Sequence, residues 1–176
     1  MAGCHGSIGI LSKNEDKKMF RDVARKKQKL ADEECIALLK NEKRGVLSVM
    51  GDEGYPYGMP LNHFYNEEDG RIYFHSGKQG HKIDAMRKCS KASFCVYDSG
   101  YKKDGDWALN FRSVIVFGRI EFVEDNKQAC EISRRLSYKF TCDSEYIENE
   151  IKNYGKGVLV FALVPEHMTG KTVNEA

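Results

Sequence analysis

The order of the predicted elements indicates a mainly β protein of the α+β class, in which six antiparallel strands form a small barrel with flanking helices. Six apolar runs of strand length, separated by turn residues, are spread over a chain of 176 residues, a length that fits one domain. The helical patterns lie between and after groups of strands and do not alternate with each strand. A doubly wound α/β fold is therefore disfavoured, and a barrel with few free edges is favoured.

The first predicted element is a helix over residues 30–40. Apolar side chains recur there at helical spacing, and the acidic residues 32–34 occupy the first turn, where the helix dipole favours anions. A strand is predicted over residues 45–50, and the turn residues 51–54 lead into the next strand. The chain therefore begins with a helix followed by a hairpin.

The second strand, over residues 55–65, contains two prolines. Pro56 and Pro60 cannot donate the N–H bonds of a sheet ladder. We therefore expect this strand to be bulged or to lie at a sheet edge, where its main-chain groups stay available to a ligand. The main chain of four residues is the expected contact surface for a flat ring: Met59, Pro60, Leu61 and Asn62.

The rest of the chain continues in the order strand, helix, strand, strand, helix, helix and strand, over residues 71–75, 80–88, 91–98, 109–124, 125–140, 144–154 and 157–164. The strand over 109–124 is long enough to bend, and Gly118 is its expected bulge. Asp125 and Ser144 are the expected N-caps of the two late helices. Residues 99–106 are polar and predict a loop, and the last strand is expected to be fully buried.

Charge and composition exclude several classes of protein. Residues 13–29 hold eight Lys or Arg against three acids, so this arm carries +5 and the rest of the chain −3, which gives the formal net charge of +2. The arm lacks interleaved aromatic residues for base stacking, so a solvated arm is favoured over a nucleic-acid partner. The longest apolar runs have only strand length, so no membrane span is expected.

The six cysteines are scattered without a Cys-x-x-Cys pair, which indicates neither a zinc site nor a disulfide framework. Free thiols suit a reducing compartment, and a cytoplasmic location is expected. Residues 1–18 do not have the order of a secretory signal, because the lysines follow the apolar patch. They are interpreted as a leader or extension without order, and residues 19–176 as the single domain.

The most informative segment spans residues 72–83, where an apolar strand passes into a helix through small, hydroxyl and basic residues. The N–H groups of a helix start carry partial positive charge, so Ser76, Gly80, His81 and Lys82 predict a phosphate site. An ordinary exposed loop would use the same residue types. His75 ends the strand beside this loop, where it could relay a proton or hold a cofactor, although a lone histidine is more often structural.

These segments together resemble the FMN-binding split-barrel superfamily related to pyridoxamine 5′-phosphate oxidase, and within it the Nim-type nitroimidazole-resistance proteins. The resemblance runs from about residue 19 to residue 171. The order and spacing of its pieces carry it, and the main pieces are residues 54–62, 72–76, 80–82, 111–118 and 169–171.

The resemblance implies a split barrel that forms a homodimer, with FMN in clefts between the subunits. By this resemblance Ser76, His81 and Lys82 hold the phosphate, and His75 lies beside the flavin as the catalytic candidate. The partner subunit would contribute Phe111, Arg112 and Ser113. The implied activity is an FMN-dependent reduction of small nitroaromatic substrates, in which FMN supplies the redox chemistry.

The chain departs from the oxidases of the vitamin pathway at two places. Tyr57 and Asn62 stand where those enzymes carry basic residues, and their C-terminal arginine-containing substrate motif is absent. A pyridoxamine-phosphate-oxidase-like enzyme with another substrate is one alternative to the nitroreductase. A flavin-binding redox sensor or carrier without turnover is another, and a deazaflavin or haem in the same barrel is a third.

Overall fold

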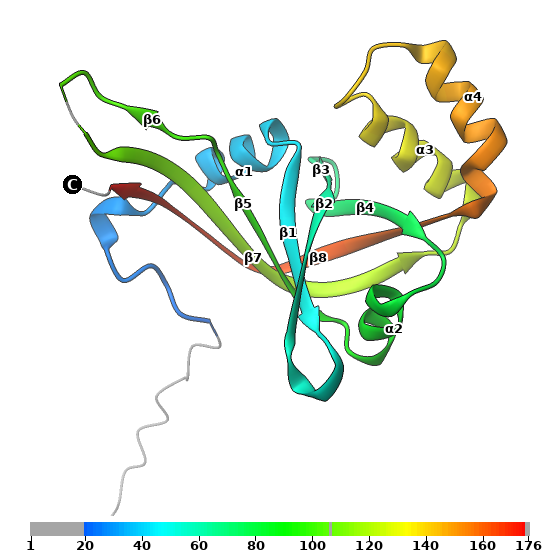
Figure 1. Cartoon of the computed structure of the whole chain (residues 1–176), viewed down its shortest axis with the longest axis horizontal. Helices are drawn as coiled ribbons and strands as arrows, with labels where there is room; N and C mark the ends of the chain where they lie inside the picture. The colour runs from blue at the N-terminus through cyan, green and yellow to red at the C-terminus, as the bar shows by residue number, and fades with distance from the viewer. Residues whose placement is uncertain (1–19, 106, 175–176) are drawn as a thin grey trace, which may run out of the picture.

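The structure is a computed structural model that describes residues 20–105 and 107–174. It contains one curled antiparallel sheet of eight strands (Figure 1), in the order β2-β1-β5-β7-β8-β4-β3, with β6 paired to β7. The strands are β1 Arg44–Met50, β2 Pro56–Asn62, β3 Phe64–Asn66, β4 Arg71–Gly77, β5 Lys91–Tyr97, β6 Tyr101–Lys102, β7 Leu109–Val123 and β8 Val158–Asn174. The predicted mainly β fold with antiparallel pairing is confirmed.

Four α-helices flank the sheet. They are α1 Asp32–Asn41, α2 His81–Lys88, α3 Asn126–Ser137 and α4 Ser144–Tyr154. Three short 3-10 turns complete the regular structure: η1 Lys26–Gln28, η2 Asp52–Gly54 and η3 Gly155–Gly157. In Figure 1 the pair α3 and α4 lies at one end of the sheet and the start of β7 lies at the other. No helix within the described ranges combines the length and apolarity needed to cross a bilayer.

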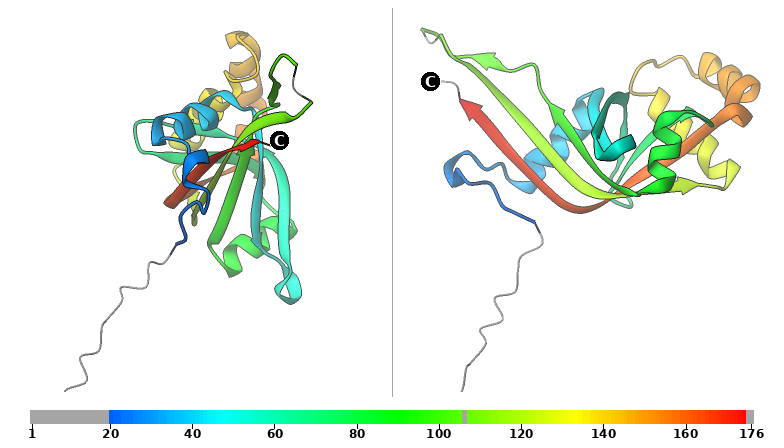
Figure 2. Two further views of the ribbon diagram at one scale, coloured as in Figure 1. Left: turned by 90° about the vertical axis from the view of Figure 1, so that its left-hand side faces the viewer. Right: turned by 60° about the horizontal axis from the view of Figure 1, so that its bottom comes forward.

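The two long strands β7 and β8 form the spine of the sheet, and Figure 2 shows their curvature from the side. Their pairing runs from Asn110 opposite Asn174 to Val123 opposite Val160, with a register shift between Phe117 and Gly118. The predicted bulge at Gly118 is therefore confirmed. A bulge increases local twist, so it bends both strands at the place where the sheet curls.

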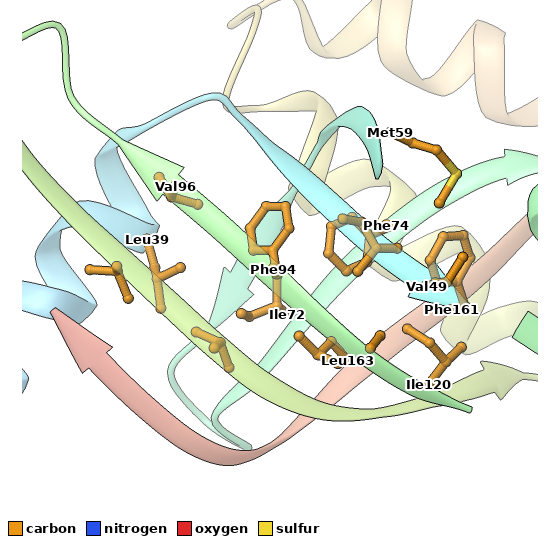
Figure 3. Close-up of a cluster of buried hydrophobic side chains, with 14 of the residues drawn as sticks. Leu39, Val49, Met59, Ile72, Phe74, Phe94, Val96, Ile120, Phe161 and Leu163 are labelled. Carbon is orange, nitrogen blue, oxygen red and sulfur yellow. The ribbon is translucent and has the colours of Figure 1, made fainter. Parts of the chain in front are cut away.

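The main core fills the inside of this curl. Figure 3 shows Phe74, Phe94 and Phe161 at its centre, and all three side chains are fully buried. The rings of Phe74 and Phe94 meet edge to face with centroids 5.0 Å apart, and those of Phe74 and Phe161 stack at 5.3 Å. Both arrangements are favourable for aromatic pairs. The second cluster, around Tyr73 and Val160, lies under α3.

The predicted count of six strands was wrong by two, because the single strand expected over residues 55–65 is broken at His63 and a short strand, β6, lies within the expected loop. The break has a structural consequence. The chain passes from β2, at one edge of the sheet, to β3, at the other edge, through His63 alone. This single-residue connection brings the two edges together and gives the curled sheet its barrel shape.

The last strand also differs from prediction, in its end and in its burial. The last strand does not end at residue 164 but continues to Asn174, because its second half pairs with the first half of β7. Near its start, Val160 to Leu163 are buried, whereas Val158 and Val164 are only half-buried. The expectation of a fully buried strand over residues 157–164 therefore holds for residues 160–163 alone.

The helix N-caps were predicted with mixed success. Asp125 caps α3 by accepting a hydrogen bond from the Gln128 N–H at 2.7 Å, as expected. For α4 the expected Ser144 was wrong by one residue, because Asp143 accepts the hydrogen bond from the Tyr146 N–H at 2.9 Å. A carboxylate at this position also gains from the helix dipole, which a hydroxyl does not.

The described part of the basic arm lies along the end of β8. The Leu30 N–H donates to the Gly170 carbonyl at 3.0 Å, and Leu30 is buried. Lys26 and Lys29 both pair with Asp22, at 2.5 and 2.9 Å, and both lysine side chains remain largely exposed. The leader predicted over residues 1–18 lies outside the described residues.

Candidate functional site

The predicted ring-contact strand lies at the edge of the sheet, as its prolines indicated. β2 pairs with β1 on one side only, and Pro60 is exposed opposite Val46. Met59 is 6% exposed and belongs to the core, so its main chain alone can serve a ligand. The Asn62 side-chain oxygen accepts a hydrogen bond from the Arg44 Nε at 2.9 Å. The strand therefore presents a main-chain edge, held in place by buried side chains.

The junction of β4 and α2 has the geometry of an anion site. Gly80 is the N-cap residue of α2 and has φ +119°, a value that L side chains rarely adopt, and no side chain caps the helix. By contrast, carboxylates cap both α3 and α4. Ser76 and Lys82 flank the uncapped helix start, and both side chains are half-buried. The free N–H groups of such a start attract an anion.

The structure places His81 differently from Ser76 and Lys82. Its ring stacks on Tyr57 with centroids 4.3 Å apart, and its Nε2 lies 3.3 Å from a carboxylate oxygen of Asp52. These contacts fasten the start of α2 to the hairpin between β1 and β2. His81 is thus adjacent to the anion site, but its ring is directed toward β2 and η2.

His75 and Asn62 are thirteen positions apart in sequence, and the structure brings them to the same cavity of about 300 Å³. Burial lowers the pKa of His75, and the positive charge of Lys82 lowers it further. The side chain nevertheless keeps solvent access. At neutral pH the ring is therefore neutral, with one nitrogen as donor and the other as acceptor.

The opposite wall of this cavity was missed in the sequence. It consists of residues from α3 and α4, including Ser133, Tyr146, Glu150 and Tyr154. The signal was present, because Tyr146, Glu150 and Tyr154 recur every four residues and so share one helix face. The sequence does not show what that face meets.

Phe111, Arg112 and Ser113 are not near the other predicted site residues within one chain. They lie at the start of β7, opposite the end of β8, and Figure 1 shows this region at the far end of the sheet from α3 and α4. Arg112 Nε donates to a carboxylate oxygen of Asp98 at 2.9 Å, and its main-chain N–H donates to the other oxygen at the same distance. The described fold thus divides the predicted site into two groups.

Residues 31–172 match the family model described as pyridoxamine 5′-phosphate oxidase. No curated protein matches the chain. Among solved structures, the chain is similar to a proposed 5-nitroimidazole antibiotic resistance protein from Bacteroides thetaiotaomicron. That similarity has 20% identity and a TM-score of 0.69, and it covers 83% of this chain and 87% of the other.

Two further solved structures share the fold. A FAD-binding protein from Mesorhizobium loti is 22% identical with a TM-score of 0.59, over 83% of this chain and 97% of the other. The FAD and heme binding protein from Mycobacterium smegmatis is 16% identical with a TM-score of 0.67, over 85% and 74%. Identities this low establish the fold alone, whereas the family model spans most of the chain. The chain belongs to the pyridoxamine 5′-phosphate oxidase family.

Proposed function

We propose that this protein is an FMN-dependent oxidoreductase that reduces small nitroaromatic compounds of the 5-nitroimidazole type. The observation that carries the proposal is the uncapped start of α2, where free N–H groups lie beside Ser76 and Lys82. Ser76 directly follows His75, which lines the cavity. Family membership supports a flavin. The structural neighbour named for 5-nitroimidazole resistance supports the substrate class.

The residues present fit a flavin phosphate. An ideal Cβ at Gly77 or Gly80 would meet nothing within 4 Å, so the space in front of the helix start is open. Lys82 supplies a positive charge and Ser76 a hydroxyl, and both are strong partners of phosphate oxygens. The free main-chain edge of β2 would lie along the ring. FMN, when bound, supplies the electron transfer.

His75 has the properties of a proton-handling residue at this place. Its lowered pKa keeps the imidazole neutral at pH 7, so one ring nitrogen can donate a hydrogen bond to a reacting oxygen while the other accepts one. Asn62 lines the same cavity and offers an amide, with its oxygen already held by Arg44. Together they would orient a polar substituent of the substrate.

A homodimer belongs to the proposal. Phe111, Arg112 and Ser113 lie too far along the sheet to reach the first group within one chain, so a second copy would have to supply them. The outer face of β1, β5 and β7 carries exposed apolar side chains that suit burial by this copy. Their exposed fractions are 48% for Met50, 58% for Tyr97, 39% for Ile115 and 38% for Phe117.

Replacing Lys82 by alanine is expected to weaken FMN binding by about 1.5–3 kcal/mol, because a charged hydrogen bond to the phosphate is lost. This corresponds to a dissociation constant about 10- to 150-fold higher, measured by quenching of FMN fluorescence on titration. Lys78→Ala removes an exposed lysine of the same loop and is the matched control. Unchanged affinity in Lys82→Ala would refute the phosphate assignment.

Replacing His75 by alanine is expected to retain FMN and to abolish electron transfer to the nitroaromatic. The test reduces the bound flavin chemically, mixes it with a 5-nitroimidazole without oxygen and follows flavin reoxidation, so the natural reductant is not needed. Lys82→Ala at saturating FMN should keep the rate and is the comparison. Loss of flavin from His75→Ala would show that His75 has a structural role. If the wild-type protein holds reduced flavin and the nitroimidazole does not reoxidise it, the protein is a sensor or carrier.

A further inference from the structure

The cavity behind His75 extends well beyond the predicted flavin contacts. Its volume is about 300 Å³, and α3, α4 and the start of β8 form most of its wall. A cavity of this size is large enough for a small aromatic molecule, and neither the anion site nor the free edge of β2 requires it. The cavity therefore needs an explanation of its own.

The side chains that line the cavity suit a flat ring. Ile147 and Leu136 form an apolar floor and are almost fully buried. Tyr146 and Tyr154 stand about two helical turns apart on the same face of α4 and are 57% and 63% exposed. Aromatic residues on a cavity wall pack well against a planar ligand, and their solvent exposure leaves the rings free to do so.

The two helices that form the wall are linked by an ion pair. Arg134 of α3 reaches both carboxylate oxygens of Glu148 on α4, at 2.5 Å from Nε and 3.0 Å from Nη2. Its third hydrogen bond goes to Glu131 of its own helix. These contacts lie on side chains that do not line the cavity, and they link α3 to α4 beside it.

The charge of the cavity limits its ligands. None of the described residues that line it is a lysine or an arginine, and the one carboxylate among them is Glu150. His75 adds no charge at neutral pH because its pKa is lowered. The formal charge on the cavity wall is therefore negative, which disfavours an anionic ligand relative to a neutral or cationic one.

We propose that the cavity between α3 and α4 is a binding site for small flat aromatic molecules that are neutral or cationic, and that Glu150 excludes anionic ones, including phosphorylated pyridines. The identification of the bound molecule as the electron acceptor rests on the proposed function. The binding of an aromatic molecule in the cavity does not depend on a flavin. The two sites then differ in the charge they bind: the cavity excludes anions, and the anion site at the start of α2 attracts them.

The first test uses two probes of equal size, 4-nitrobenzamide and 4-nitrobenzoate, with affinities measured by NMR titration of the protein with and without FMN. The neutral amide is expected to bind about tenfold more tightly than the carboxylate. Glu150→Lys should remove or reverse this preference. Glu145→Lys makes the same charge change on α4 outside the cavity and should leave the preference as in the wild type.

The second test fills the cavity. Ser133→Phe places a ring inside it and is expected to weaken binding of the amide about tenfold or more, whereas Gln128→Phe adds the same ring to an exposed position of α3 and should have no effect. Three results would overturn the proposal: the wild type does not bind the amide, it binds both probes equally, or each variant behaves like its control. Because binding is read without turnover, a protein that takes no flavin but passes these tests would refute only the proposed function.

Discussion

Gly118→Ala is expected to lower the free energy of unfolding by about 3 kcal/mol or more. An ideal Cβ at this position lies 2.1 Å from the carbonyl oxygen of Val164 and 2.9 Å from its carbonyl carbon. Both atoms belong to the backbone of β8, so they cannot rotate away as the end of a flexible side chain would. Relief of the overlap would have to separate β7 from β8 at the bulge, where the longest strand pair of the sheet bends.

Urea unfolding followed by circular dichroism measures this loss. The matched control is Gly157→Ala, because an ideal Cβ at Gly157 meets nothing within 4 Å and its φ lies outside the left-handed region. The control is expected to keep the wild-type stability or to gain slightly, since alanine restricts the unfolded chain. A Gly118→Ala protein as stable as its control would show that β8 moves aside at little cost.

Much of the fold was predictable because it rests on local pattern. Gly118 marked the bulge, the two prolines marked an edge strand, and the alternation of apolar residues located most strands. The departures depend on contacts between distant residues. Residues 165–174 are mostly polar and follow the predicted last strand, yet they form the second half of β8 because the first half of β7 pairs with them. β6 exists for the same reason, since it pairs with residues 109–110.

The site divides in the same way. The candidate anion site could be located in the sequence because its residues lie close together, from Ser76 to Lys82. The position of His81 was not, since its ring is held by Asp52 and Tyr57, which come much earlier in the chain. The cavity wall from α3 and α4 was missed for a related reason: only the packing of these helices beside β4 and β8 brings Glu150 to the same cavity as His75.

A second large effect is expected on acidification. Lowering the pH from 7 to 4.5 should reduce the free energy of unfolding by about 2–3 kcal/mol through His63 alone. His63 is fully buried, and its ring meets Phe94 edge to face with centroids 4.9 Å apart. The pKa of His63 is lowered from 6.5 to about 3, mainly by burial and in addition by the nearby charge of Lys139, while the hydrogen bond to Leu39 opposes the change.

The geometry explains why the neutral ring is required. Nε2 lies 2.8 Å from the carbonyl oxygen of Leu39, and since a carbonyl only accepts, Nε2 carries the hydrogen. Nδ1 is buried and has no hydrogen-bond partner among the described residues. A proton added there would place an uncompensated charge beside the Lys139 ammonium, whose Nζ donates to the Glu42 carbonyl at 2.7 Å.

The direction of the pH dependence follows from proton binding. Between pH 6.5 and about 3 the unfolded chain protonates His63 while the folded protein does not, so acid favours the unfolded state throughout this range. Urea unfolding at a series of pH values measures the slope, and His63→Gln isolates it, because the amide can donate to Leu39 but does not titrate. The difference in free energy of unfolding between the two proteins should be independent of pH above 7 and should change steadily as the pH falls below 6. Parallel curves for both proteins would mean that His63 gains a proton in the folded state, and that the connection between β2 and β3 opens to water without unfolding the barrel.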